Sequence, residues 1–278
     1  MNRYFKKLSL PYLIFLIIFA VLPMLFMTVL SFMDNEGTDF TDAVVTVSNF
    51  EQFTYKSTLV AFGNSLLYSF VTTLICAVLG YLVAYKIWRS HFKNKFLITT
   101  LLVLPMWSNI LLRVNALEGI LEPHNILTSI FSKMGWNITF PMIAGTPFAV
   151  ILGLCATYLP LMILTIYSAL EKVEKQYEEA SLDLGLTPLV TFWKVILPLS
   201  SKGIVTGAIM VFLPCMSGFA IPEILGQGNV VLIGNVINDA FKNMNYNVGS
   251  LLAIVILIFI LGAILIVNKV DKDGEGVI

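Results

Sequence analysis

The stretch EEASLDLGLTPLVTFWKVILPLS, residues Glu178–Ser200, lies between two long apolar segments of a 278-residue chain. Hydrophobic residues make up 58% of the chain and charged residues only 12%. This apolar fraction exceeds the roughly 45–50% that is usual for globular proteins. A charged segment interrupted by glycine and proline is unusual in such an apolar chain. If the apolar segments cross a membrane, the role of this stretch depends on the side of the bilayer on which it lies.

Long apolar runs on both sides of this stretch predict membrane-spanning helices, because a helix needs about 20 apolar residues to cross a hydrocarbon core of about 30 Å. The first run is too long for a signal peptide and precedes no small-residue cleavage site, so we expect it to remain as a span. We predict an all-α membrane protein with a single transmembrane domain over residues 1–278. The six predicted spans are Leu8–Met33, Leu59–Tyr85, Phe96–Leu112, Ile143–Leu170, Gly203–Ile221 and Gly249–Val267.

Basic residues are concentrated in alternate connecting segments. The N-terminus, residues 86–95, residues 171–202 and the tail after Val267 hold 13 of the 17 Lys and Arg residues. Lys and Arg accumulate on the cytoplasmic side of membrane proteins. We therefore predict that both termini are cytoplasmic and that residues 171–202 form a cytoplasmic loop between spans 4 and 5.

Three prolines lie inside predicted spans at a similar depth. Pro105, Pro160 and Pro214 are each about ten residues from a cytoplasmic flank, roughly 15–17 Å at the helical rise. A proline inside a helix removes one backbone hydrogen bond and clashes with the preceding turn. We predict bends at all three prolines, around a central path.

The opening stretch contains signals for a helix, a tight turn and a second helix. Glu171–Leu184 is rich in helix formers, and Gly185 suits the left-handed residue that ends a helix. Thr187 and Pro188 are a typical N-cap and first helical residue. The second helix is expected over Leu189–Ile196, so the loop predicts a compact helical knob.

The same residues resemble the EAA loop of ABC importer permeases, whose pattern is Glu-Ala-Ala, three residues, Gly, nine residues, Ile, one residue, Leu-Pro. The chain departs from it at Ser181 and Val195, two substitutions of similar volume. In that family the loop forms a coupling helix that fits a groove on a cytoplasmic ATPase. The resemblance implies ATPase coupling through Glu179, Ala180, Ser181, Gly185, Leu197 and Pro198.

Three further segments look like parts of the spermidine/putrescine permeases, specifically the B-type subunit: Pro105–Leu121, Leu213–Gly226 and Leu232–Phe241. The resemblance implies a multi-pass permease of the bacterial inner membrane that serves ATP-driven polyamine import. Its implied partners are an ABC ATPase dimer, a second permease subunit and an extracytoplasmic polyamine-binding protein, with no nucleic acid. The chain lacks a phosphate-binding loop, so ATP and Mg are expected on the ATPase and no cofactor on this chain.

A polyamine carries several positive charges separated by methylene groups, so its path should offer carboxylates and aromatic faces. A solvated loop is the simpler interpretation of each carboxylate taken alone. The candidate path residues are Trp107, Asn109, Tyr158, Glu118, Glu223 and Asp239.

Two other classes of protein compete with this interpretation. A permease for another small solute, such as iron, an anion or an opine, would carry the same EAA loop. An intramembrane enzyme is disfavoured because His91 and His124 fall in loops on opposite sides, so we expect no catalytic residues. Cys76, Cys155 and Cys215 lie within predicted spans and are expected to be packing residues, with no disulfide or metal site.

Overall fold

The computed structural model describes residues 3–34, 44–90, 92–123, 125–133 and 141–271. His91 and His124 lie outside these ranges. The described residues form helices joined by turns, with one isolated antiparallel bridge between Met33 and Val45. The structure therefore confirms the all-α class.

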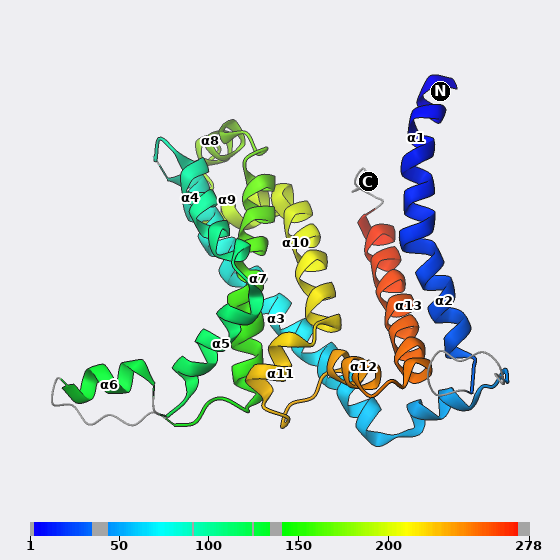
Figure 1. The fold of residues 1–278 in the computed structure, drawn as a ribbon. Helices are drawn as coiled ribbons and strands as arrows, with labels where there is room; N and C mark the ends of the chain where they lie inside the picture. The colour runs from blue at the N-terminus through cyan, green and yellow to red at the C-terminus, as the bar shows by residue number, and fades with distance from the viewer. Residues whose placement is uncertain (1–2, 35–43, 91, 124, 134–140, 272–278) are drawn as a thin grey trace.

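The first half of the chain contains α1 (Arg3–Leu16), the π-helical turn η1 (Ile17–Val21), α2 (Leu22–Ser31), the 3₁₀ turn η2 (Ser48–Thr54), α3 (Lys56–Arg89), α4 (Lys95–Val103), the 3₁₀ turn η3 (Leu104–Trp107), α5 (Ile110–Leu121) and α6 (Ile126–Lys133). The second half contains α7 (Pro147–Leu170), α8 (Lys175–Asp183), α9 (Pro188–Thr191), the π-helical turn η4 (Phe192–Ile196), α10 (Leu197–Ser217), α11 (Ala220–Gly226), α12 (Ile233–Lys242) and α13 (Tyr246–Asp271). Figure 1 shows these elements in order of colour.

Within the described residues, five helical segments are long and apolar enough to cross a membrane: Leu10–Ser31, Lys56–Arg89, Pro147–Leu170, Pro188–Ser217 and Tyr246–Leu265. They correspond to the predicted spans 1, 2, 4, 5 and 6. A bent helix pair brings the number to six if it is counted as one span.

That bent pair corrects the third predicted span, which was expected to run through Phe96–Leu112. The structure instead has two apolar helical pieces, Leu97–Trp107 and Ile110–Leu121, that meet at 89°. Pro105 lies in the first turn of η3, where it cannot donate a backbone hydrogen bond to the preceding helix. The chain turns a few residues after this proline, between Trp107 and Ile110.

The other two prolines do not interrupt their helices. Pro160 lies inside α7, and Pro214 lies inside α10 three residues before its end at Ser217. The bends predicted at these two positions stay predictions.

Helices α3, α7 and α10 pack together as the central core. The buried face of α3 carries small side chains, among them Ala61, Ser69, Thr72, Cys76 and Ala84. Small residues let helix backbones approach closely in membranes. The three cysteines are free, and Cys76 and Cys215 are fully buried in this core.

Glycines on α10, among them Gly203, let it approach α7 closely. A Cβ atom on Gly203 would collide with the Ala169 methyl group and the Thr165 carbonyl of α7. Only glycine therefore fits where α10 crosses this end of α7.

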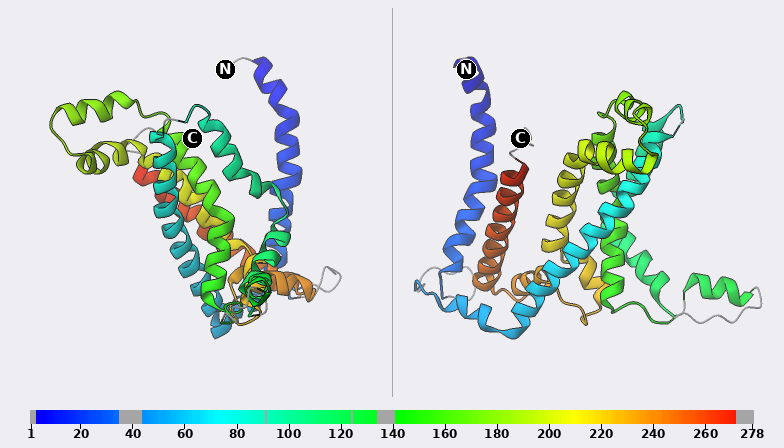
Figure 2. Two further views of the ribbon diagram at one scale, coloured as in Figure 1. Left: turned by 90° about the vertical axis from the view of Figure 1, so that its left-hand side faces the viewer. Right: turned by 180° about the vertical axis from the view of Figure 1, so that it is seen from behind.

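Helices α2 and α13 form a second packed pair beside the core, and α3 runs diagonally from the core toward this pair (Figure 1). The start of α1, the end of α13 and the α8–α9 segment lie at one end of the molecule (Figures 1 and 2). Helices α11 and α12 and the turn η2 lie at the opposite end. Both described chain ends therefore share a side with the loop between the fourth and fifth predicted spans.

Candidate functional site

The loop between α7 and α10 folds as a helix, a turn and a second helix. The first helix, α8, begins at Lys175, because residues 171–174 form a turn after α7. The predicted helix start at Glu171 is therefore wrong by four residues. Gly185 follows with a φ of +84°, and the Thr187 side chain accepts a hydrogen bond from the backbone N–H of Val190.

The second helix of the loop is longer than predicted. It begins at Pro188 and continues through the π-helical turn η4 into α10, ending at Ser217. Leu197 and Pro198 therefore lie inside a continuous helix, with Pro198 in the first turn of α10. A displacement of the turn at Gly185 would be transmitted directly into the fifth span.

A buried hydroxyl pair joins the two helices of the loop. Ser181 of α8 and Thr191 of α9 lie 2.5 Å apart, oxygen to oxygen, and both residues are buried. The hydroxyl of Ser181 is what distinguishes this chain from the second alanine of the EAA pattern. Sequence reasoning treated the substitution as a mild change of similar volume. In the structure its hydroxyl group also supplies a hydrogen bond between the two helices.

Aromatic rings hold the base of the loop against α3. The Phe192 ring meets Tyr81 and Tyr85 edge-on, with ring centroids 5.4 and 5.2 Å apart. The Tyr81 hydroxyl also lies 2.7 Å from the Ser200 hydroxyl of α10. These contacts join residues more than 100 positions apart, so no local sequence signal could have identified them.

An ion pair completes the junction with α3. The Arg89 guanidinium, at the end of α3, lies 3.4 Å from the Glu178 carboxylate of α8. Together with the aromatic contacts, it joins the loop to α3 as well as to α10.

The opposite face of the loop is open to solvent. Glu179, Ala180 and Gly185 are exposed, and Leu184 is 84% exposed. The turn therefore presents an apolar side chain on the surface of the protein.

The aromatic and amide path candidates lie in different surroundings. Trp107, the last residue of η3, is 88% exposed. Asn109 caps α5 by accepting a hydrogen bond from the backbone N–H of Leu111 at 2.8 Å. Tyr158 of α7 is half-buried against the hydrophobic core.

The three carboxylate candidates lie on α5, α11 and α12, at the end of the molecule opposite α8 (Figure 1). Glu118 accepts a hydrogen bond from the Gln227 side chain at 2.9 Å. Asp239 is exposed on α12.

Glu223 is already paired within the chain. Its carboxylate lies 3.0 Å from the Lys242 ammonium and accepts a hydrogen bond from the Asn235 side chain at 2.9 Å. The hydrogen bonds from Asn235 and Lys242 lower the pKa of Glu223 below its ordinary value. The structure therefore connects α11 to α12 through this carboxylate, for which sequence reasoning had weighed only a place in the path against a solvated loop.

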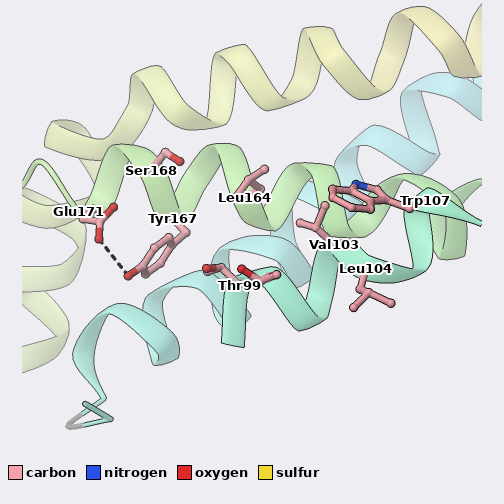
Figure 3. Close-up of a pocket in the computed structure, with 9 residues that line it drawn as sticks. Thr99, Val103, Leu104, Trp107, Leu164, Tyr167, Ser168 and Glu171 are labelled. Atoms are coloured by element: carbon pink, nitrogen blue, oxygen red, sulfur yellow. Dashed lines mark hydrogen bonds between the residues drawn. The ribbon is translucent and has the colours of Figure 1, made fainter. Parts of the chain in front are cut away.

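A groove with a cavity volume of about 500 Å³ lies between α4–η3 and α7. Trp107 and Glu171 lie toward opposite ends of it, and the Tyr167 hydroxyl donates to the Glu171 carboxylate at 3.3 Å (Figure 3). The residues that line it are Thr99, Thr100, Val103, Leu104, Trp107, Leu164, Tyr167, Ser168 and Glu171. Within the described ranges, no group of three or more His, Cys, Asp or Glu side chains is placed to hold a metal ion.

The apolar helical core with its candidate membrane spans and the protruding helix–turn–helix loop are the features that the sequence analysis predicts for a membrane permease. Residues 78–272 match the family described as the binding-protein-dependent transport system inner membrane component. The chain belongs to this family and is an inner membrane protein.

Two relatives match much of the chain. The spermidine/putrescine transport system permease protein PotB of Haemophilus influenzae is 33% identical over 273 residues, covering 98% of this chain and 96% of the relative. PotB of Escherichia coli is 34% identical over 229 residues, covering 82% and 83%.

A bacterial alginate ABC transporter, solved in complex with a periplasmic protein carrying an alginate pentasaccharide, contains a chain with the same fold. Its TM-score is 0.80 at 16% identity, with 99% of this chain and 96% of that chain covered. The likeness shows that the chain has the fold of an ABC transporter subunit.

Proposed function

We propose that this chain is the permease subunit of an ATP-driven importer of polyamines. The observation that carries the proposal is the end-to-end similarity to spermidine/putrescine permeases, which extends over 98% of the chain in one relative. The exposed helix–turn–helix loop supports it, because an importer subunit without a nucleotide site needs a surface for the ATPase.

The loop over residues 171–202 faces the cytoplasm in this proposal, and both termini share that side. The concentration of basic residues on these segments supports the orientation. The exposed turn around Ala180–Leu186 enters a groove on an ABC ATPase dimer. ATP and Mg belong to that dimer and not to this chain.

Nucleotide-driven closure of the dimer moves the loop as a lever. The Ser181–Thr191 hydrogen bond keeps its two helices together. The continuous helix from Pro188 to Ser217 transmits the motion into the fifth span, and the Arg89–Glu178 pair transmits it to α3.

The opposite end of the molecule receives the substrate. An extracytoplasmic polyamine-binding protein docks over α5, α11 and α12, where Glu118 and Asp239 supply negative charge. The charge of Glu223, the third carboxylate candidate there, is compensated by Lys242. A second permease subunit completes the path, and Trp107, Asn109 and Tyr158 are its candidate contacts on this chain.

Labelled spermidine and putrescine uptake tests the proposal, in cells that lack this chain and in the same cells with the chain restored. Restored, ATP-dependent uptake that excess unlabelled polyamine abolishes is the expected result. Equal uptake with and without the chain, with all partner subunits present, would remove polyamines from the proposal. The same assay with an iron complex, an anion or an opine would then identify the alternative solute.

A further inference from the structure

The groove between α4–η3 and α7 combines three kinds of surface within one cavity. Val103, Leu104 and Leu164 supply apolar side chains. Thr99, Thr100, Tyr167 and Ser168 supply hydroxyl groups, Trp107 an indole ring and Glu171 a carboxylate. A small-molecule site typically has mainly apolar walls, a few convergent polar groups and a volume of about 300–1,000 Å³. The groove has these properties.

Its charge selects the class of ligand. Glu171 is the one charged residue among the lining residues, so the groove is negative at one end. Lys95 acts on Glu171 electrostatically. Its ammonium donates a hydrogen bond to the backbone carbonyl of Trp88, and among the described residues it forms no ion pair with the Glu171 carboxylate. Tyr167 holds the Glu171 carboxylate in place and leaves it further lone pairs for an incoming donor.

Its length selects an elongated ligand. Thr99 and Trp107 are eight residues apart on one wall, and Leu164 and Glu171 are seven residues apart on the other. The helical rise then gives a groove of about 10–12 Å. An extended polyamine, whose ammonium groups are separated by short methylene linkers, has a comparable length.

We propose that this groove binds the transported polyamine on its way out of the permease, at the end of the molecule that carries α8. Glu171 accepts hydrogen bonds from one terminal ammonium group, the hydroxyl groups line the middle, and the methylene linkers lie on the apolar walls. Trp107 faces a second cationic nitrogen, an attraction that operates within about 6 Å of an aromatic ring. The proposal rests on the polyamine function proposed above and adds a binding site to it.

The position of Glu171 favours this role. It directly follows α7 and lies outside the predicted span, so its carboxylate avoids the cost of a charge at the bilayer centre. It also directly precedes the loop that carries α8. Movement of that loop therefore changes the end of the groove that holds the ammonium group.

Equilibrium binding of radiolabelled spermidine tests the site, with the whole transporter in lipid nanodiscs and without nucleotide. Glu171→Gln should weaken binding roughly tenfold to hundredfold, the effect of losing a hydrogen bond between charged groups. Trp107→Ala should weaken it about two- to fivefold and Trp107→Phe less, because phenylalanine keeps an aromatic face. In uptake by proteoliposomes, the KM for spermidine should rise in the same order of variants.

Glu174→Gln is the matched control. Glu174 is an exposed carboxylate three residues from Glu171, it lies outside the groove, and its side chain makes no cap hydrogen bond with α8. This variant should bind spermidine like the unsubstituted chain. Size-exclusion chromatography of each complex establishes that the isosteric Glu171→Gln change leaves the transporter assembled.

Two results would overturn the site. Unchanged binding by Glu171→Gln would show that the groove is a surface for lipid or for the second permease. An equal loss for Glu171→Gln and Glu174→Gln would show a general effect of charge and not a site. If the unsubstituted complex neither binds nor transports polyamine, the proposed function itself fails. If the unsubstituted complex does both and Glu171→Gln has no effect, only the groove fails.

Discussion

Gly185 offers the most direct test of the lever, because only its backbone conformation is at stake. Its φ of +84° lies in the left-handed region, and a Cβ atom built there meets no atom within 4 Å. A side chain at this position therefore causes no clash inside the chain. Its cost is the strain of the left-handed conformation, roughly 1–2 kcal/mol for an ordinary residue. The strain is greater for a β-branched residue and smaller for asparagine.

These costs predict a graded series of variants. At 1–2 kcal/mol, Gly185→Ala should reduce the population of the native turn roughly 5–30-fold relative to competing conformations. Gly185→Val should abolish ATP-driven uptake, Gly185→Ala should leave an intermediate rate, and Gly185→Asn should retain most of it. Gly63→Val is a matched control, because Gly63 lies in α3, has open space around its Cβ position and has no left-handed φ.

Uptake of labelled polyamine and polyamine-stimulated ATP hydrolysis should be measured for each variant at equal membrane levels. Normal uptake by Gly185→Val would refute the lever. Equal loss for Gly185→Asn and Gly185→Val would also refute the reasoning, since it would place the defect in side-chain volume at the ATPase surface and not in the backbone.

Three further predictions concern contacts that hold the loop and the opposite end of the molecule. Ser181→Ala and Thr191→Val should each destabilise the transporter by about 1 kcal/mol. The double variant should lose less than the sum of the two, because both single variants lose the same hydrogen bond. Thermal unfolding of all four forms measures this coupling. Arg89→Glu alone should lower uptake, and the double variant that exchanges Arg89 and Glu178 should restore it. Equal defects in the single and the exchanged variants would exclude a role for the pair. Hydrogen bonding lowers the pKa of Glu223 in the folded protein. The stability that this carboxylate contributes is therefore complete above its ordinary pKa of 4.5 and is lost as pH falls through the lowered pKa. Glu223→Gln should flatten the dependence of the thermal unfolding temperature on pH in that range, and an unchanged profile would contradict this prediction.

Ser181 shows how the chain can depart from a family pattern without losing the architecture. Without a hydrogen-bond partner, a serine at this position would bury an unsatisfied hydroxyl group, which lowers stability by about 1–3 kcal/mol. Here Thr191 faces it from the second helix of the loop. Two helices joined by a short turn must face one another, so the pairing of Ser181 with a residue about ten positions later could have been sought in the sequence.

The carboxylate candidates show where prediction from sequence stops. Glu118, Glu223 and Asp239 were chosen by their charge and by their position in outer loops. The structure gives them different surroundings: a hydrogen bond to Gln227, an ion pair with Lys242 and exposure to solvent. Residue type predicts the charge of a side chain, but only the neighbours that packing places around it decide whether that charge is already compensated.

The sequence by itself determined the local features of this protein. Long apolar runs predict spans because crossing a bilayer requires a minimum apolar length. The turn at Gly185 and the cap at Thr187 were predicted because both depend on the conformational properties of single residues.

Only the tertiary structure decided the rest. The third span is broken between Trp107 and Ile110, where its two pieces meet at 89°. The proline at position 105 signals a possible bend in the sequence, but it does not set the angle. The contacts of Phe192 with α3 and the groove from Trp107 to Glu171 join segments separated by 57 or more residues. Such contacts depend on how the helices pack against one another, and that packing is a property of the assembled core and not of any single stretch of sequence.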